Sequence, residues 1–373
     1  MKFKDVNITL RRKYLWFLGI IAAVIVLIIV IIGIKMAVSP MLSDVVKLPF
    51  NDSQQYCFTG TGFLYIDNNY VRYLDLDGSG YPAILNNTDV KITGSGKKMH
   101  VVYDDTSISI IGNKEAVLVD GKIESVKCCD DYAACLVIKD GKERIEVYDI
   151  KGKLLETIET DMELSDFGFS GVKRQLLYTV TIELATENFV STITTYEPSQ
   201  GATTGVITVQ NQLIEKIVFG EKSIFVKGTE NIIRFDAATN KEAYRLIANG
   251  YEMLDCFSDI NTYMILRSEN ENNNMLTMYR ASQTNVSDMR ILPLYKLSND
   301  LATFVYGDYI YSFTENKLNR YSLKGKICEQ EKIGFNATEV IRLKDDYVLI
   351  KSNNSLYSAK INKSNLVKQT FSK

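Results

Sequence analysis

Histidine, tryptophan and proline are scarce in this sequence, whose 373 residues include one His, one Trp and five Pro. A zinc site with two or more histidine ligands is therefore excluded, and a Ser-His-Asp or Cys-His site would have to use His100. No G-x-S-x-G motif supplies a nucleophile. Because His100 lies in the apolar run Met99-His-Val-Val-Tyr103, we expect it in a strand rather than in a catalytic site.

An excess of charge of either sign is also missing. The formal net charge is −2, from 43 basic and 45 acidic residues, and 46% of the residues are hydrophobic. This composition is typical of a folded chain rather than a disordered one. The first 13 positions hold a cluster of basic residues, and the rest of the chain is mildly acidic. Nucleic acid is therefore not expected as a partner, because the basic footprint of nucleic-acid-binding proteins is absent.

One hydrophobic run is long enough to cross a membrane. Residues 15–34 contain no charge, and a helix of this length spans about 30 Å, the thickness of the hydrocarbon core. We expect a transmembrane helix over 14–35 that contacts membrane lipid through 15–34. The alternative is a cleavable signal peptide, for which Ala37-Val-Ser39 offers small residues. The length of the run, and Pro40 directly after the cut, favour retention as an anchor.

The flanking charges predict the orientation of this helix. Basic residues cluster before it, whereas only Lys35 and Lys47 follow within the next 13 positions. The positive-inside rule then places the N-terminus in the cytoplasm. We predict a single-pass protein of the cell membrane, with a cytoplasmic tail (1–13), a linker (36–49) and an extracytoplasmic domain (50–373).

Beyond residue 50, short strand patterns recur about every 40 residues. An apolar-aromatic strand that runs into a polar turn occurs eight times, at Phe63–Asp67, Met99–Tyr103, Tyr132–Ile138, Gln175–Val180, Ser223–Lys227, Thr262–Leu266, Tyr309–Phe313 and Tyr347–Lys351. A second strand follows it and ends in a turn that contains Gly or Asn. Its clear copies are Val71–Ser79, Ile145–Lys153, Ile232–Lys241 and Leu318–Lys326, with degenerate copies near Ile110, Tyr196, Tyr279 and Tyr357.

A unit of this length that holds four short strands has the size of a propeller blade. Closing such units into a ring buries sheet faces that an open stack would leave exposed. The sequence therefore predicts an all-β fold, a β-propeller of eight blades preceded by one transmembrane α-helix. Seven blades are the alternative if an end unit is incomplete, and a β-sandwich pair or another all-β repeat is the competing architecture.

The turns of the form Tyr-Asp-x-x-Gly-Lys, as in Tyr148–Lys153, and the strand order resemble the WD40-like and quinoprotein-like propeller superfamily. The anchored arrangement resembles uncharacterised membrane-anchored β-propeller families of Gram-positive bacteria. The resemblance covers residues 50–373. The only tryptophan, Trp16, lies in the predicted anchor, so the Trp-Asp dipeptide of WD40 blades and the Trp-docking motif of quinoprotein blades are both missing. No functional residue is therefore carried over.

Several acidic turns have the composition of a site. Asp75-Leu-Asp-Gly-Ser-Gly80 is similar to the first half of a calcium loop, but its twelfth position is Asn86 where a bidentate Glu is expected. Other repeats have turns such as Asp-Ile-Lys-Gly at the same place, so we expect a hairpin turn. The pairs Asp104-Asp105, Asp130-Asp131 and Asp345-Asp346 leave a two-carboxylate glycosidase open, although we expect them at matching solvated turns.

Two further patterns are weak. Gly94-Ser-Gly-Lys97 lacks the spacing of a phosphate-binding loop, and we expect a turn there. The six cysteines contain no C-x-x-C motif, and a chain of this size does not need a disulfide framework. We expect them to be mostly free, buried thiols: Cys57, Cys128, Cys129, Cys135, Cys256 and Cys328.

Two segments lengthen the units that contain them, Glu183–Gln210 in the fourth unit and Glu269–Asn274 in the sixth. Insertions of this kind are expected to form loops on a face or on the rim of a propeller, where they serve in binding. Surface drift without a function is the alternative.

No catalytic, cofactor-binding or metal-binding residue is predicted. The leading hypothesis is a membrane-tethered, non-enzymatic propeller that binds or scaffolds a protein or a cell-envelope polymer. The alternative is an extracytoplasmic glycan-active hydrolase or lyase on the same scaffold. A third hypothesis is a subunit whose transmembrane helix pairs with another helix through its few small residues, such as Gly19 and Gly33.

Overall fold

The computed structural model of the protein describes residues 21, 23–27, 40–80, 85–86, 90–96, 98–171, 173–184, 188–258, 261–270, 276–282, 289–294, 300–344 and 346–362. The predicted tail and most of the predicted span lie outside these residues. No helix within the described ranges has the length and the apolar character needed to cross a membrane. Residues Asp44–Ala359 form one compact unit of β-strands.

The strands of the described residues form eight four-stranded sheets. Neighbouring strands pair antiparallel in blades 1 to 7, as do the first two strands of blade 8. Blades 1 to 4 contain β2 (Tyr56–Phe58), β3 (Gly62–Asp67), β4 (Tyr70–Asp75) and β5 (Leu85–Asn86); β6 (Lys91–Ser95), β7 (Met99–Tyr103), β8 (Ser107–Ile110) and β9 (Val117–Leu118); β10 (Lys122–Cys128), β11 (Tyr132–Lys139), β12 (Lys142–Asp149) and β13 (Leu154–Glu159); and β14 (Glu163–Phe169), β15 (Leu177–Leu184), β16 (Phe189–Glu197) and β17 (Ala202–Gln210).

Blades 5 to 8 repeat this pattern, except that the first strand of the chain supplies the fourth strand of blade 8. They contain β18 (Ile214–Phe219), β19 (Ser223–Gly228), β20 (Asn231–Asp236) and β21 (Glu242–Ile247); β22 (Tyr251–Ser258), β23 (Asn261–Ser268), β24 (Leu276–Ser282) and β25 (Met289–Leu294); β26 (Ala302–Tyr306), β27 (Tyr309–Phe313), β28 (Lys317–Ser322) and β29 (Ile327–Lys332); and β30 (Glu339–Lys344), β31 (Tyr347–Ser352), β32 (Ser355–Ile361) and β1 (Leu42–Lys47).

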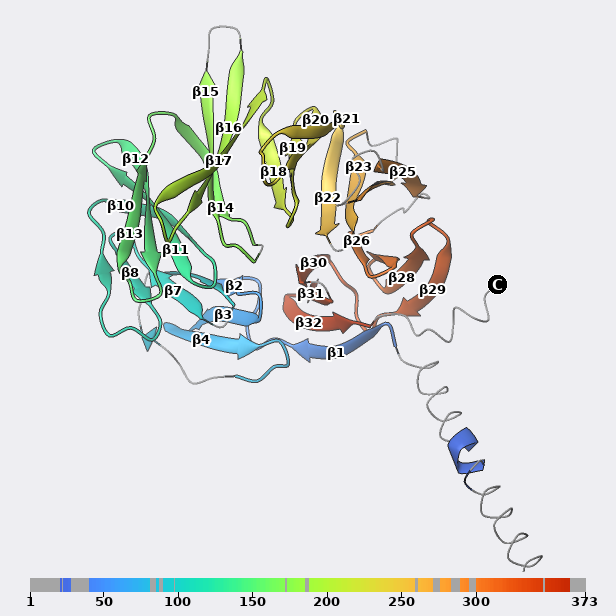
Figure 1. The fold of residues 1–373 in the computed structure, drawn as a ribbon. Helices are drawn as coiled ribbons and strands as arrows, with labels where there is room; N and C mark the ends of the chain where they lie inside the picture. The colour runs from blue at the N-terminus through green and yellow to red at the C-terminus, as the bar shows by residue number, and fades with distance from the viewer. Residues whose placement is uncertain are drawn as a thin grey trace, which may run out of the picture. The chain divides into compact units, whose positions relative to one another are not determined.

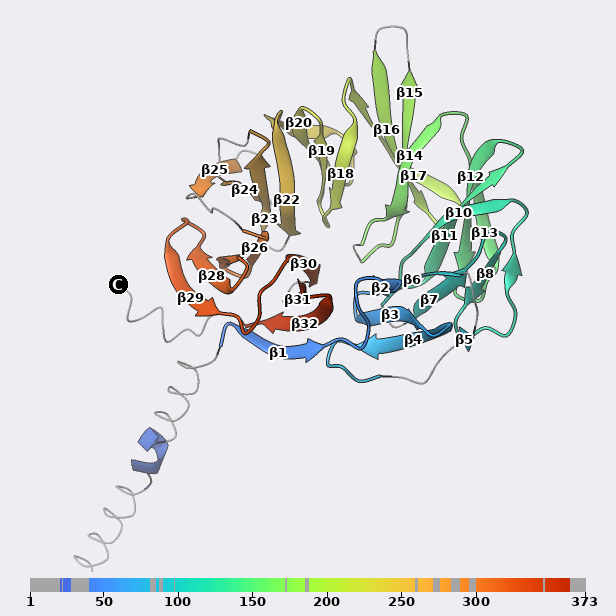
Figure 2. The ribbon, with the colours of Figure 1, turned by 180° about the vertical axis from the view of Figure 1, so that it is seen from behind.

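The eight sheets follow one another around a ring, with the first strand of each sheet nearest the centre (Figures 1 and 2). This arrangement is an eight-bladed β-propeller. The predicted apolar-aromatic strands are the second strands of the eight blades, namely β3, β7, β11, β15, β19, β23, β27 and β31. The strands predicted to follow them are the third strands, namely β4, β8, β12, β16, β20, β24, β28 and β32. The prediction of eight blades is confirmed, and the alternatives of seven blades and of a β-sandwich pair are wrong.

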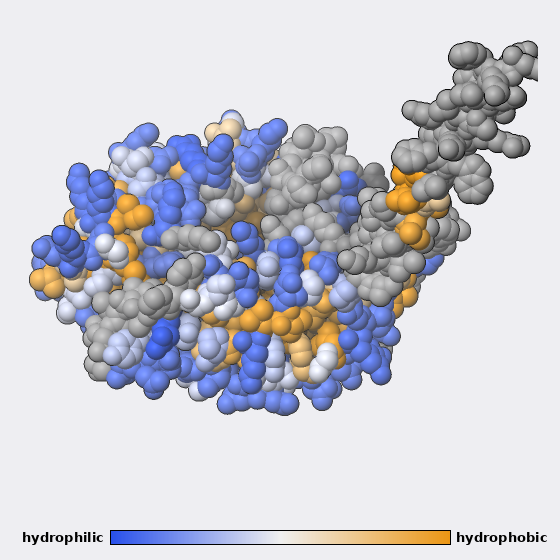
Figure 3. Space-filling model, turned by 90° about the horizontal axis from the view of Figure 1, so that it is seen from below, coloured by the Kyte–Doolittle hydropathy of each residue, from blue (hydrophilic) through white to orange (hydrophobic). Residues whose placement is uncertain are grey.

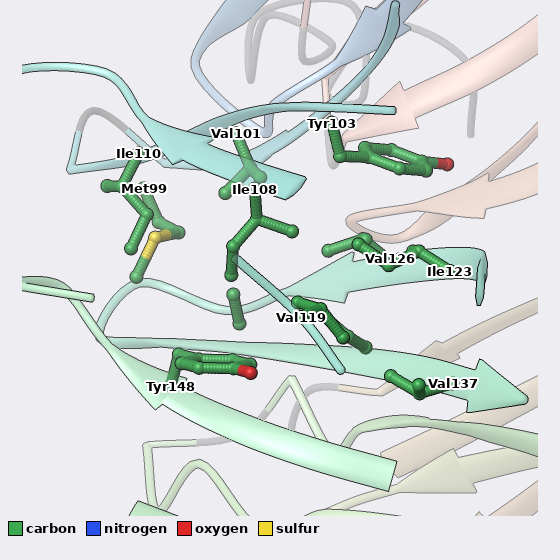
Figure 4. Packing of buried hydrophobic residues seen from close by; sticks show 12 residues of the cluster. Met99, Val101, Tyr103, Ile108, Ile110, Val119, Ile123, Val126, Val137 and Tyr148 are labelled. Carbon is green, nitrogen blue, oxygen red and sulfur yellow. The ribbon is translucent and has the colours of Figure 1, made fainter. Parts of the chain in front are cut away.

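The second strands read as continuous apolar runs because both of their faces are buried between neighbouring blades. In β11, Ala133, Cys135 and Val137 pack with residues of blade 2, whereas Ala134 packs with residues of blade 4. Figure 4 shows the cluster between blades 2 and 3, where Met99 and Ile108 approach Tyr148. Burial of side chains of this size stabilises a fold by roughly 1.5–3 kcal/mol each.

The first strand of five blades contains a β-bulge. The register against the second strand shifts between Ile123 and Ser125 in β10 and at similar positions of β14, β18 and β22, whereas in β30 it shifts at the end of the strand, between Arg342 and Lys344. A bulge bends its strand and turns the following side chain. We call the residue after each bulge the post-bulge residue; these are Ser125, Asp166, Lys216, Asp255 and Lys344.

The outermost strands alternate exposed and partly buried residues, in contrast to the second strands. Strands β13 and β21 share this alternation. On the side of the propeller presented in Figure 3, hydrophilic residues cover most of the surface and a band of hydrophobic residues crosses it. The fourth strands are therefore half-solvated, as expected for strands that close a sheet toward water.

The eighth blade joins the two ends of the domain. Strand β1 is the outermost strand of a sheet whose other strands are β32, β31 and β30. Next to it, Leu48 N–H donates to Leu356 O at 2.9 Å, and Ser358 Oγ donates to Leu76 O at 3.1 Å in blade 1. The sequence predicts a linker over 36–49, but β1 occupies part of it, because a strand that lies at the sheet edge carries little apolar signal.

The long fourth unit forms strands rather than the predicted loops. Residues Glu183–Gln210 extend β15 and build β16 and β17, and Figure 1 shows the β15–β16 hairpin reaching beyond the neighbouring sheets. The Thr-rich composition of this segment explains the difference, since β-branched residues favour strands. In the sixth unit, Glu269 and Asn270 follow β23, and 271–274 lie outside the described residues.

Candidate binding cavity

A cavity of about 620 Å³ lies between the first strands of blades 5 to 8. We call it the central cavity. Its wall contains Lys216 of β18, Leu254 and Asp255 of β22, residues 301–304 at β26 and residues 340–344 of β30. The size is within the range of small-molecule sites, about 300–1,000 Å³. Three of its lining residues are post-bulge residues, so the bulges shape this wall.

An ion pair between blades 6 and 8 forms the buried part of the wall. Arg342 Nη1 lies 2.7 Å from Asp255 Oδ2, and the two side chains are only 15% and 14% exposed. Asp255 also accepts the backbone N–H of Val305 in blade 7 at 3.3 Å. The guanidinium of Arg342 lies over the ring of Phe304, 5.1 Å from its centroid. This cluster therefore connects the first strands of three consecutive blades.

Burial dominates the electrostatics of this cluster. It raises the pKa of Asp255 above its ordinary value, and the opposing attractions of Arg342 and Lys216 are the smaller effects. The same burial raises the pKa of the adjacent Cys256 to about 12. A thiol with so high a pKa is not a nucleophile at neutral pH. The cluster therefore holds three blades together, and its thiol is not activated.

A second inter-blade ion pair uses the equivalent position of blade 4. Lys127 of β10 lies 2.7 Å from the post-bulge Asp166 of β14 and over the ring of Phe167. Both groups are about half exposed, so this pair contributes little stability. The post-bulge residues from blade 4 to blade 6 alternate in charge, with Asp166, Lys216 and Asp255 in order.

None of the residues that line the central cavity was predicted from the sequence. Asp255 and Arg342 are 87 positions apart and meet only because blades 6 and 8 face the same cavity. The available signal was the presence of charged residues in the otherwise apolar first strand of successive units. The spacing of those residues is irregular, because the bulge adds one residue in some blades.

The calcium-like segment is a hairpin turn, as predicted. Gly78 N–H donates to Asp75 O at 3.0 Å, and Gly78 has a φ of +86°, which glycine adopts without strain. Gly152 and Asp149 make the same bond in blade 3. The side chain of Asn86 is outside the described residues. No group of three His, Cys, Asp or Glu residues with metal-binding geometry occurs in the described part of the chain.

His100 lies in strand β7, as predicted, and stacks on Tyr73 of blade 1 with ring centroids 4.8 Å apart. Its Nε2 is 3.1 Å from Gly96 O. Burial lowers the pKa of His100, so the ring is neutral at neutral pH. The turn predicted at Gly94–Lys97 begins later than expected, because Gly94 and Ser95 are the last residues of β6 and Gly96 is the first residue of the turn. Lys97 is outside the described residues.

The acidic pairs lie in turns. Asp130-Asp131 and Asp346 lie in matching turns, between the first and second strands of blades 3 and 8, whereas Asp104-Asp105 lies between the second and third strands of blade 2. The prediction of matching turns is therefore wrong for Asp104-Asp105, which occupies another turn of its blade. Asp104 accepts the N–H groups of Thr106 and Ser107 and caps its turn. Asp345 is outside the described residues.

All six cysteines are free, and the four that burial affects most have raised pKa values. Cys328, in the outermost strand β29, is the exposed one. The prediction of free thiols is confirmed in the structure, and that of burial is wrong for Cys328 because β29 faces water.

Solved structures with a similar fold are β-propellers. The WD40 domain of SCAP from fission yeast is 8% identical with a TM-score of 0.55, covering 87% of this chain and 95% of that one. The C-terminal WD40 domain of Sif2 has 10% identity and a TM-score of 0.51, covering 87% and 99%. BamB from Moraxella catarrhalis has 12% identity and a TM-score of 0.50, covering 87% and 98%.

No protein-family model matches the sequence, and no curated protein matches it either. The identities to the solved structures are so low that the likeness shows the fold alone. The chain shares the fold of WD40-like and BamB-like β-propellers.

Proposed function

We propose that the protein is a membrane-tethered binding module, whose extracytoplasmic propeller holds a protein or cell-envelope partner. The observation that carries this proposal is the central cavity, an open site of about 620 Å³ on a rigid ring of eight sheets. Sites of this kind on a preformed scaffold recognise ligands without folding on binding.

The tether is supported by sequence and by local exposure. Residues 15–34 carry no charge, and the helical residues Val24, Ile25, Val26 and Leu27 are all 47–59% exposed. Four consecutive helical residues point to all sides of a helix, so apolar side chains face outward all around it. Such a segment favours a lipid environment over water.

The alternative of a glycan-active enzyme has less support. Glycosidases use two carboxylates on opposite sides of the scissile bond. Two of the lining residues of the central cavity are acidic, Glu252 and Asp255, and Asp255 is held by Arg342 and by Val305 N–H. A carboxylate engaged in this way is poorly placed to transfer protons or attack a sugar.

Labelling of Cys328 tests the tether and its orientation. A membrane-impermeant maleimide added to intact cells is expected to label wild type but not the Cys328→Ser variant, because Cys328 is the exposed cysteine. A cysteine introduced at Asn7 is expected to react only after the cells are permeabilised. Labelling of Cys328 only after permeabilisation, or loss of the protein from carbonate-washed membranes, would contradict the proposal.

Binding is tested separately with the full chain in detergent. Cross-linked membranes and isolated cell-wall material are incubated with it, and the retained partner is identified. Saturable retention of one partner supports the binding module. Turnover of a cell-wall glycan without any saturable retention would instead identify the protein as an enzyme.

A further inference from the structure

The wall of the central cavity carries more positive than negative charge, although the chain as a whole has an acidic excess. Six lining residues are charged: the basic Lys216, Arg267, Arg342 and Lys344, and the acidic Glu252 and Asp255. A cavity with low-dielectric walls strengthens the field of such groups. The net charge of the cavity wall is therefore positive, whereas the net charge of the whole chain is negative.

Two of these cations are already neutralised. Arg342 is paired with Asp255 at 2.7 Å, and Arg267 lies 3.3 Å from Asp300, whose side chain is 5% exposed. Neither pair leaves a full charge for a ligand. The Arg342–Asp255 pair joins blade 8 to blade 6, and the Arg267–Asp300 pair joins blade 6 to the segment before β26. Both ion pairs therefore hold the cavity wall in place.

Lys216 and Lys344 remain. Each is exposed, and neither has an ion pair with any residue that the structure describes. Both are post-bulge residues, of blades 5 and 8, and both line the central cavity. Glu252 is the one carboxylate of the wall outside the Asp255 pair; it reduces the positive field of the two lysines without cancelling it.

Most of the uncharged lining residues are apolar. Leu254, Leu301 and Phe304 contribute to the wall beside the lysines. An occupant of a cavity of about 620 Å³ would therefore need an anionic group and a less polar remainder. A lysine ammonium recognises carboxylate and phosphate as a point charge, with three donors that are not fixed in direction.

We infer that the central cavity binds an anionic ligand, whose phosphate or carboxylate group lies between Lys216 and Lys344 and whose remainder contacts Leu254, Leu301 and Phe304. The inference rests on the proposed binding function and names the chemistry of its ligand. The anion is either a free small molecule or a unit of a partner, and both present the same group to the lysines.

The test is titration calorimetry of the full chain in a nonionic detergent, with inorganic phosphate, glycerol phosphate and acetate as probes. Wild type is expected to bind at least one of them, with an affinity that falls as salt is added. Butyl phosphate, a fourth probe, is expected to bind tighter than phosphate, because its alkyl group can contact the apolar wall. The double variant Lys216→Gln/Lys344→Gln is expected to lose about tenfold or more in affinity, because charged hydrogen bonds are removed.

The control is Lys142→Gln/Lys151→Gln, which removes the same charge from two exposed residues of blade 3, the first residue of β12 and a residue of the turn after it. It is expected to bind like wild type. Equal weakening in both double variants, or no binding of any probe by wild type, would overturn the inference. Since the measurement needs neither membrane nor partner, its failure is distinct from a failure of the topology or retention experiments. Unchanged thermal unfolding of the variants shows that the exposed lysines are not needed for folding.

Discussion

Removal of the Arg342 side chain tests the account of the central cavity most directly. In Arg342→Met an unbranched apolar side chain replaces the guanidinium that lies over Phe304, and the partner of Asp255 is lost. Asp255, which is only 14% exposed, then keeps the backbone N–H of Val305 at 3.3 Å as a donor. A buried carboxylate without its counter-ion is destabilising.

The magnitude follows from the burial of the pair. Breaking a buried ion pair by removing one partner costs roughly 3–5 kcal/mol, and the residual exposure of both groups places this pair just below that range, at about 2–3 kcal/mol. Arg245→Met is the matched control, since Arg245 and Glu242 form a pair at the same 2.7 Å but are 45% and 40% exposed. Its expected effect is below about 1 kcal/mol.

The effect of Arg342→Met is expected to depend on pH. Burial raises the pKa of Asp255 and Arg342 opposes that rise, so the pKa increases further in the variant. A carboxyl with a raised pKa binds more protons in the folded state, and the free energy of unfolding therefore decreases as pH rises above the ordinary Asp value of about 4. The destabilisation is thus small near pH 4 and fully present at neutral pH.

Urea unfolding of the full chain in detergent at pH 4 and pH 7.5 measures these free energies. Asp255→Asn in the Arg342→Met background is expected to restore most of the stability at pH 7.5, because the uncompensated charge is removed. A loss in Arg342→Met that is no larger than in Arg245→Met, or that is equal at both pH values, would refute the reasoning.

Three further predictions concern other parts of the ring. Gln212→Ala should destabilise the protein by about 2 kcal/mol in thermal unfolding, because the buried Gln212 Oε1 accepts the backbone N–H groups of Glu230 and Asn231; a loss below the measurement error would contradict this. A thiol reagent should modify Cys328 rapidly and the other cysteines only in denaturant, and fast modification of two or more thiols would be inconsistent with the fold. A chain that starts at residue 36 should keep the thermal unfolding midpoint of the full chain. A chain that starts after Lys47 lacks β1, so it should unfold at a lower temperature and aggregate through the open edge of β32. Equal midpoints of the two shortened chains would argue against closure of the ring by β1.

The fold was predictable to the extent that its strands are buried on both sides. In β19 all six residues are buried, and the sequence shows this as the apolar run Ile224–Val226 at the centre of the strand. The fourth strands gave no such signal: β5 and β9 have two residues each, and β13 alternates with water on one face. Repeats of the second strand were therefore enough to count the blades, while the inner and outer strands were not placed.

The cavity was beyond prediction because its residues come from separate units. Lys216, Asp255 and Arg342 each sit in a different blade, and each lies in a strand of mixed apolar and charged residues that gives no sign of a shared site. Their proximity depends on the ring being closed and on bulges that sequence patterns do not reveal. Turn chemistry, in contrast, is local, and the hairpin at Asp75–Gly80 was therefore predictable from its glycine and its repetition.

The eighth blade also sets the order of events during synthesis. Strand β1 leaves the ribosome first among the strands, and its neighbour β32 leaves last. Blades 1 to 7 each form from a continuous stretch of chain as it emerges, but β1 has no partner until residue 361 has been made. A prematurely ended chain therefore displays an open strand edge, which quality-control proteases and chaperones recognise, so closure of the ring reports that translation reached β32.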